Sequence, residues 1–139
     1  MRFLMLAAVV LVAVAGPVAR AQEAPNAEMD RAETELRSGG VVSVQVLNEF
    51  AAVAARKLKM SITDIRDVLA AVRAICEIAP ITEETHDAGL RVAERYGLSV
   101  YDAMIVAAAL LAECTVLVSE DMQNGQLFEG KVRVRDPFR

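Results

Sequence analysis

Short apolar strands that alternate with longer helical segments are the feature that most constrains this fold. Brief strands are predicted at residues 41–44, 77–81 and 115–119, and helical segments of ten or more residues separate them. Connections of that length join parallel strands by right-handed crossovers, which place helices on the faces of the sheet. The sequence therefore predicts a single α/β domain of three layers, α/β/α, with a mostly parallel central sheet.

Capping residues mark where the predicted helices begin and end. The residues suited to the position before a first helical turn are Asn26, Ser61, Thr82 and Ser99. The predicted helices span residues 26–38, 45–60, 61–75, 82–96 and 100–112. The last of them is apolar on nearly every side, so we expect a buried central helix. Residues 131–135 alternate in polarity and predict a final, half-exposed edge strand.

The amino terminus has two interpretations. Met1 and Arg2 precede an apolar run of 13 residues from Phe3 to Ala15, and Ala19-Arg20-Ala21 follows before Gln22. This local pattern is typical of a cleaved export signal, and the run is too short for a stable membrane span. The alternative is that part of the run, residues 6–12, forms a buried first strand. Residues 1–21 are thus a signal-like or atypical first-strand segment, and residues 22–139 are the folded domain.

The charge balance limits how this protein could contact a nucleic acid. There are 15 Lys and Arg against 19 Asp and Glu, a formal net charge of −4. A net negative protein cannot coat a polyanion by bulk charge, so contact requires a local basic patch or a metal ion. Arg56, Lys57 and Lys59 form one such basic group. They are either a solvated helix end, favoured by the helix dipole, or a patch that steers phosphates.

Cysteine and histidine offer no chemistry of their own here. Cys76 and Cys114 lie far apart, with no further Cys or His at metal-ligand spacing. They are expected to be small buried thiols, which excludes a zinc pattern and a disulfide scaffold. His86 has no spaced partner and is expected on a helix surface, so a histidine-based nucleophilic mechanism is not supported.

Three acidic residues follow predicted strands or open a helix. Glu49 comes shortly after the strand at residues 41–44, Asp102 opens the apolar helix, and Asp121 follows the strand at residues 115–119. In a parallel sheet, chemistry belongs at the carboxyl ends of the strands. Clustered carboxylates repel one another and are tolerated chiefly around a divalent cation, and oxygen ligands suit Mg²⁺ or Mn²⁺. Such a cation could support hydrolysis of phosphodiester bonds.

Each of the three acids also has a purely structural interpretation. Ser99 and Asp102 have the spacing of a capping box, in which Asp102 would only satisfy backbone donors. Glu49 could be a solvated helix carboxylate stabilised by the helix dipole, and Asp121 could be a turn residue. The residue pattern by itself leaves both interpretations open.

Three stretches of the sequence stand out, and they read VSVQVLNEF at residues 42–50, YGLSVYDAMIVAAA at residues 96–109 and SEDMQNG at residues 119–125. Together they resemble the PIN-domain ribonuclease family, and most closely the VapC-type toxins of bacterial toxin–antitoxin pairs. The resemblance covers about residues 39–138. It implies a cytoplasmic, Mg²⁺- or Mn²⁺-dependent endoribonuclease, often dimeric, that an antitoxin holds inactive. Glu49, Asp102 and Asp121 match acidic positions of the family's metal site.

One departure from the family concerns the first strand. The family opens with a strand that ends in an Asp, whereas residues 6–11 read LAAVVL and the first acidic residue is Glu23. Loss of one carboxylate weakens the hold on a hard cation. The leading hypothesis is therefore an endoribonuclease toxin impaired by one missing ligand. The alternatives are a catalytically inactive PIN-like module that binds an antitoxin or RNA, and an exported small domain without nuclease activity.

Overall fold

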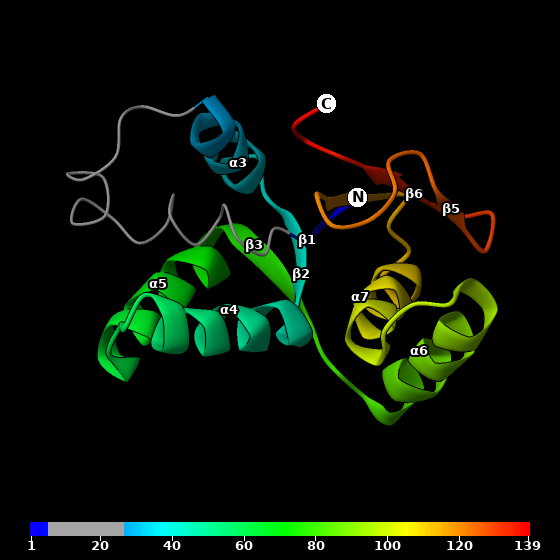
Figure 1. The fold of residues 1–139 in the computed structure, drawn as a ribbon, viewed down its shortest axis with the longest axis horizontal. Helices are drawn as coiled ribbons and strands as arrows, with labels where there is room; N and C mark the ends of the chain where they lie inside the picture. The colour runs from blue at the N-terminus through cyan, green and yellow to red at the C-terminus, as the bar shows by residue number, and fades with distance from the viewer. Residues whose placement is uncertain (6–26) are drawn as a thin grey trace.

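The computed structural model describes residues 1–5 and 27–139 (Figure 1). Predictions that concern residues 6–26, including the Asn26 cap and most of the signal-like segment, lie outside this part of the chain. The helices are α3 (Ala27–Arg37), α4 (Val44–Lys57), α5 (Ile62–Ile75), α6 (Glu83–Tyr96) and α7 (Val100–Leu111). The strands are β1 (Arg2–Met5), β2 (Gly40–Ser43), β3 (Cys76–Ala79), β4 (Val116–Ser119), β5 (Leu127–Phe128) and β6 (Val132–Arg135).

The sheet has the order β3-β2-β1-β4-β6-β5, and every neighbouring pair is parallel except β5 and β6. This confirms the predicted α/β class with a mostly parallel sheet. Strand β1 lies between β2 and β4, earlier in the chain than the residues 6–12 considered for a first strand. The prediction of a final edge strand was wrong, because β6 lies between β4 and the two-residue strand β5, which forms the edge.

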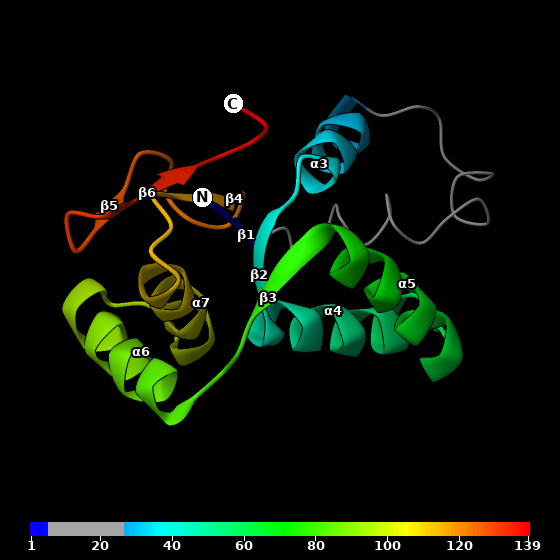
Figure 2. The same cartoon turned by 180° about the vertical axis from the view of Figure 1, so that it is seen from behind.

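Helices cover both faces of the sheet, as a three-layer architecture requires. Phe3, Val41 and Leu117 point to one face and pack with buried residues of α6 and α7. Val42 and Val118 point to the other face and pack with residues of α3 and α5. Figures 1 and 2 show α6 beside α7 on one side of the molecule, and α4 beside α5 on the other.

The predicted capping residues are confirmed at three helices. The side chains of Ser61, Thr82 and Ser99 each accept a hydrogen bond from a backbone N–H in the first turn of α5, α6 and α7. Gly97 ends α6 at a φ of 67°, in the left-handed region where glycine carries no steric penalty. Residues from Ala103 to Ala109 of α7 are all buried, as the apolar sequence of this helix predicted.

Helix α3 is part of the core. Ala32 and Leu36 are buried, and Leu36 packs against β2 and β4. The apolar face of this helix is thus occupied within the chain. No helix in the described part of the chain is both long enough and apolar enough to cross a membrane.

Candidate active site

Two buried serines end the strands that lead to the predicted acidic residues. Ser43 is the last residue of β2, and its Oγ accepts a hydrogen bond of 3.2 Å from the Val46 N–H at the start of α4. Ser119 is the last residue of β4, and its Oγ accepts one of 3.2 Å from the Asp121 N–H. Both side chains are fully buried. These serines set how the chain leaves the sheet before Glu49 and before Asp121.

Glu49 lies in the second turn of α4 and is half-buried. The Gln45 side chain, one turn earlier, donates a hydrogen bond of 3.2 Å from Nε2 to Glu49 Oε1. The pKa of Glu49 is raised above its ordinary value, mainly because burial removes water from the carboxylate. The negative charges of Asp102 and Asp121 raise it further, while the Gln45 hydrogen bond opposes the shift. Glu49 therefore interacts electrostatically with both of the other predicted site residues.

Asp121 follows β4 and keeps an exposed surface. Its pKa is also raised, first by loss of solvent around the carboxylate and then by the negative charge of Asp102. Asp102 and Asp121 are thus within electrostatic reach of each other, although they are far apart along the chain.

Asp102 lies in the first turn of α7, where the capping interpretation can be examined directly. Its backbone N–H donates a hydrogen bond of 3.2 Å to Ser99 Oγ, so the serine caps the helix. Within the described part of the chain, the Asp102 carboxylate takes part in no hydrogen bond, and it is partly exposed. Capping therefore leaves the carboxylate of Asp102 available for other interactions.

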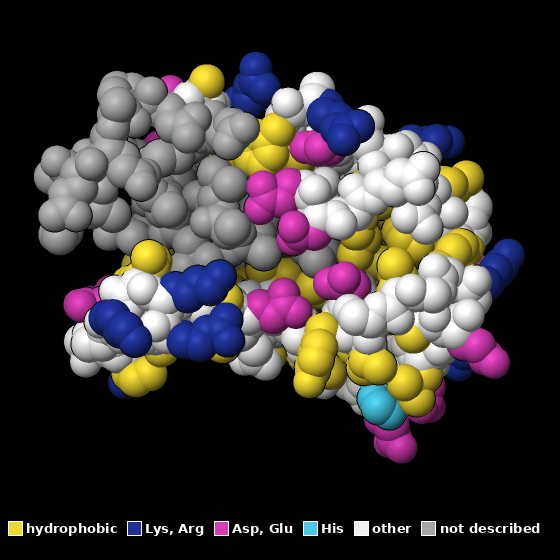
Figure 3. Space-filling view, viewed as in Figure 1, with side chains coloured by type: hydrophobic (Ala, Val, Ile, Leu, Met, Phe, Trp, Pro, Cys, Tyr) yellow, Lys and Arg dark blue, Asp and Glu magenta, His cyan; other side chains and the backbone are white. Residues whose placement is uncertain are grey.

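The structure brings Glu49, Asp102 and Asp121 within electrostatic reach of one another at the end of the sheet where β2 and β4 finish. Figure 3 shows acidic side chains gathered near the middle of one face. The donor chemistry fits a hard divalent cation, since all three groups offer carboxylate oxygens. The described residues contain no group of three or more His, Cys, Asp or Glu side chains arranged to hold a metal ion. The three carboxylates are thus neighbours without forming a complete ligand cage.

The central strand carries no carboxylate at its end. Strand β1 finishes at Met5, which pairs in register with Ser119 of β4. The family resemblance leads one to expect an Asp at the end of this strand. An apolar residue ends β1 instead, so the central strand does not supply the expected ligand.

The predicted basic group lies apart from the acids. Arg56 and Lys57 are in the last turn of α4, and Lys59 follows the helix, with all three side chains exposed. Arg56 is seven positions after Glu49, which corresponds to about 10 Å along the axis of α4. Figure 3 shows Lys and Arg side chains over α4 and α5, to one side of the acidic group.

The remaining polar candidates are where the sequence predicted them. His86 is exposed on α6, and Cys76 and Cys114 are buried free thiols. Burial raises the pKa of both thiols, which disfavours the reactive thiolate. The serines Ser43 and Ser119 were missed by the sequence analysis. Their only sequence signal is a small polar residue at the end of an apolar strand.

Comparison with known proteins identifies the family. The model of the PIN domain matches residues 9–123, which is most of the chain. A solved structure of VapBC2 from Rickettsia felis, bound to a DNA fragment from their promoter, has a similar fold with a TM-score of 0.55 and 17% sequence identity. That match covers 87% of this chain and 89% of the other. No curated protein matches this sequence. The chain belongs to the PIN domain family.

Proposed function

We propose that this protein is a metal-dependent endoribonuclease that hydrolyses phosphodiester bonds of RNA. PIN domains are generally nucleases. The observation that carries the proposal is the mutual electrostatic influence of Glu49, Asp102 and Asp121 at the end of the sheet. Unneutralised carboxylates held together in this way are costly unless a cation balances them. We assign to these three residues both the catalytic role and the binding of Mg²⁺ or Mn²⁺.

Each residue has a distinct part in this mechanism. A bound divalent cation would supply an activated water and offset charge on the phosphate oxygens. Glu49 is oriented by Gln45 and offers its second oxygen to the site. Ser119 accepts a hydrogen bond from the backbone of Asp121, which follows β4, and Ser99 accepts one from the backbone of Asp102, in the first turn of α7. The two carboxylates would thus reach the cation from two different elements. Arg56, Lys57 and Lys59 steer the RNA backbone toward the acids.

The proposed biological setting is that of a VapC-type toxin. The structural neighbour is a toxin–antitoxin complex, which supports a cognate antitoxin as the partner. We infer a cytoplasmic site of action, because the substrate is cellular RNA, and a homodimer as the assembly that the family resemblance implies. The export alternative for residues 1–21 would place the domain away from that substrate.

A second candidate function is a PIN-like module that binds RNA or an antitoxin without cleaving. The absence of a carboxylate at the end of β1 favours this candidate, because each lost ligand weakens the hold on a hard cation. The two functions differ in one measurable property, which is turnover that depends on a divalent metal.

The experiment is a titration of the purified full-length chain with MnCl₂ and MgCl₂ by calorimetry, with cleavage of a labelled single-stranded RNA followed in the same samples. Saturable metal binding and cleavage that EDTA abolishes support the proposal. The variant Asp121→Asn should lose both properties. The matched control Asp87→Asn, an exposed position on α6, should keep both. A folded protein that binds RNA but shows no metal-dependent cleavage would overturn the enzymatic proposal in favour of the binding module.

A further inference from the structure

Tyr101 is the one aromatic side chain that lies on the surface of this protein. The described part of the chain contains all of its aromatic residues, two Tyr and four Phe. The side chain of Tyr101 is 65% exposed. The others are buried or partly buried, and they are Phe3, Phe50, Tyr96, Phe128 and Phe138. Tyr101 takes part in no hydrogen bond and no ring contact with another described residue, so its ring is open to a ligand.

This ring stands beside the proposed metal site. Tyr101 directly precedes Asp102 in the first turn of α7. Consecutive Cα atoms are about 3.8 Å apart, and side chains of a helix lean toward its amino-terminal end. Figure 3 shows hydrophobic surface directly next to the acidic group on the same face. A substrate held at the carboxylates is therefore within reach of the Tyr101 ring.

Helix α7 offers RNA no positive charge. Its sequence, VYDAMIVAAALL, contains no Lys or Arg. The predicted basic group lies on a different helix, near the end of α4. At the exposed first turn of α7, the neutral side chains are those of Val100 and Tyr101. A nucleotide that lies over this turn cannot be held there through its phosphate by a cation of α7, whereas its base can stack on the tyrosine ring.

We propose that Tyr101 is the stacking platform for an unpaired nucleobase of the RNA, next to the phosphodiester bond at the three carboxylates. This inference rests on RNA as the substrate, which is part of the proposed function. Every nucleobase has a π-face and stacks on an aromatic side chain, so the contact adds affinity without selecting the identity of the base. Bases in a duplex are already stacked on their neighbours, so the ring contributes only to the binding of unpaired RNA.

The first test is the fluorescence of Tyr101→Trp in the full-length chain, which has no Trp of its own. A single-stranded RNA is added in Ca²⁺, a hard cation that takes oxygen ligands, and again in EDTA. We expect saturable quenching by the RNA, because the introduced indole stacks on a base. An abasic strand of the same length has the phosphates without the bases, and it should cause little quenching.

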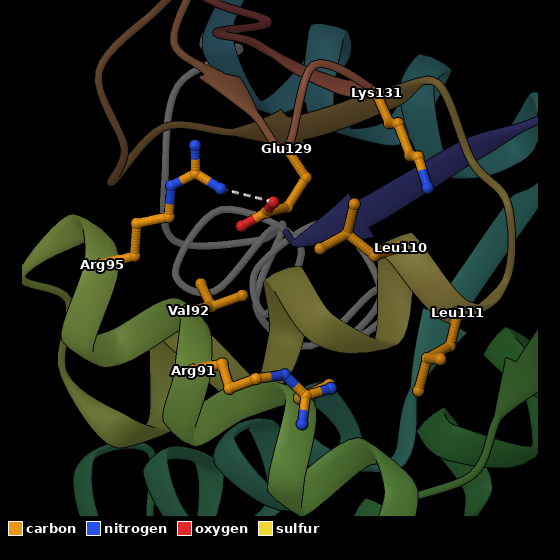
Figure 4. A pocket seen from close by; sticks show the side chains of 8 residues that line it. Arg91, Val92, Arg95, Leu110, Leu111, Glu129 and Lys131 are labelled. Atoms are coloured by element: carbon orange, nitrogen blue, oxygen red, sulfur yellow. Dashed lines mark hydrogen bonds and ion pairs between the residues drawn. The ribbon is translucent and has the colours of Figure 1, made fainter.

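The opposite end of α7 provides the matched control. Leu111 is the last residue of the helix, about 15 Å from Tyr101 along its axis. Its side chain is 42% exposed and lines a cavity of about 470 Å³ beside α6 (Figure 4). The fluorescence of Leu111→Trp should not respond to the RNA.

The second test measures affinity without a reporter. Tyr101→Ala should weaken binding of the RNA about tenfold, the scale of one contact between a base and an aromatic ring. Tyr101→Phe keeps the ring and should bind the RNA as the unchanged protein does. Both variants should keep the affinity of the unchanged protein for Mn²⁺ and for the abasic strand. In the cleavage assay, Tyr101→Ala should raise KM and leave kcat nearly unchanged, as loss of a uniform binding contact does.

Three results would overturn the proposal. Tyr101→Ala could bind the RNA as tightly as the unchanged protein, or the abasic strand could quench Tyr101→Trp as strongly as the RNA does. Tyr101→Ala could also convert a dimer to a monomer in sedimentation at unchanged RNA affinity, which would assign the ring to a second copy of the chain.

The same measurements judge the proposed nuclease activity separately. Base-dependent quenching without metal-dependent cleavage would support the stacking role of Tyr101 and overturn the enzymatic proposal. Metal-dependent cleavage with an unchanged KM in Tyr101→Ala would do the reverse. A folded protein that binds no RNA would overturn both.

Discussion

Glu35 and Glu49 are the same residue type in opposite electrostatic surroundings. Glu35, on α3, accepts a hydrogen bond of 2.6 Å from Arg2 of β1 and two, of 2.8 and 2.9 Å, from Arg135 of β6. These cations hold the pKa of Glu35 below its usual value, with the hydrogen bond from Arg135 as the main cause. Glu49 has one neutral amide donor and two carboxylate neighbours, and its pKa is raised.

The difference is the one expected between a structural carboxylate, Glu35, and a carboxylate of the proposed metal site, Glu49. Glu35 pairs with two arginines, and it joins a helix to two strands that are distant in the sequence. Glu49 is left with excess negative charge that the described residues do not balance. Carboxylates whose pKa is raised by burial and by neighbouring negative charges are common at functional sites, where the arrangement serves activity at a cost in stability. We therefore expect substitutions at the two positions to affect different properties.

The largest expected effect is on RNA cleavage. Glu49→Gln keeps the size and the hydrogen-bonding capacity of the side chain but removes a charge that the proposed metal site requires. We expect the rate of metal-dependent cleavage to fall about 100-fold or more, as loss of a metal-site carboxylate commonly does. The measurement is the initial rate of RNA cleavage at saturating Mn²⁺.

Glu35→Gln is the matched substitution at the structural position. Cleavage by this variant should equal that of the unchanged protein at temperatures where both are folded, which circular dichroism would establish. Equal losses of activity in the two variants would show that Glu49 acts only through the fold.

The second effect is on stability, where we expect Glu35→Gln, and not Glu49→Gln, to cause the larger loss. Glu35→Gln removes charged hydrogen bonds from a carboxylate whose side chain is 15% exposed, and it leaves two arginines without their partner. We expect the free energy of unfolding in urea to fall by about 2 kcal/mol. Arg37→Gln, which breaks an exposed pair with Glu33 on one helix, should cost at most about 0.5 kcal/mol. Similar losses in both variants would contradict a special role for the Glu35 cluster.

Local signals explain what the sequence could predict. The caps Ser61, Thr82 and Ser99 were found because capping depends on residues within one turn. The three acids were predicted as site residues because Glu49 and Asp121 come after strand ends and Asp102 opens the apolar helix, and their role stays a prediction. Strand β5 was missed because two residues carry no periodic signal, and this omission made β6 look like the edge.

Long-range contacts explain what the sequence could not predict. Arg135 and Glu35 are 100 residues apart, and no local pattern relates them. Strand β1 occupies the first residues of an apolar run that also resembles an export signal, so its limits were not visible in the sequence. The serines at the ends of β2 and β4 make local hydrogen bonds, but their burial comes from packing with segments that are distant in the sequence.

A smaller effect should appear when one of the repelling charges is removed without metal. In Asp102→Asn, the negative charge that raises the pKa of Glu49 and of Asp121 is gone. We expect the metal-free variant to be more stable than the unchanged protein, by less than about 1 kcal/mol. Adding Mn²⁺ should stabilise the unchanged protein but not the variant, since binding to the folded state alone shifts the unfolding equilibrium. Thermal unfolding with and without Mn²⁺ measures both differences. A metal-free variant less stable than the unchanged protein would mean that Asp102 serves the fold.

The smallest effect is the dependence of stability on pH, for which the two glutamates have opposite signs. The folded-state pKa of Glu35 is lowered, so its contribution is present above the unfolded pKa and is lost as the pH falls through the folded value. The folded-state pKa of Glu49 is raised, so the folded protein binds the proton more tightly and gains stability as the pH falls through that value.

Acidification should therefore shrink the stability advantage of the unchanged protein over Glu35→Gln. Without metal, the unchanged protein should be less stable than Glu49→Gln at neutral pH. Acidification should shrink this difference too, because protonation of Glu49 removes its repulsion by Asp102 and Asp121. Urea unfolding of the three proteins between about pH 7 and about pH 3, a range that spans ordinary carboxyl pKa values, measures both trends. A disadvantage relative to Glu49→Gln that grew on acidification would contradict the assignment of that site as one of unbalanced negative charge.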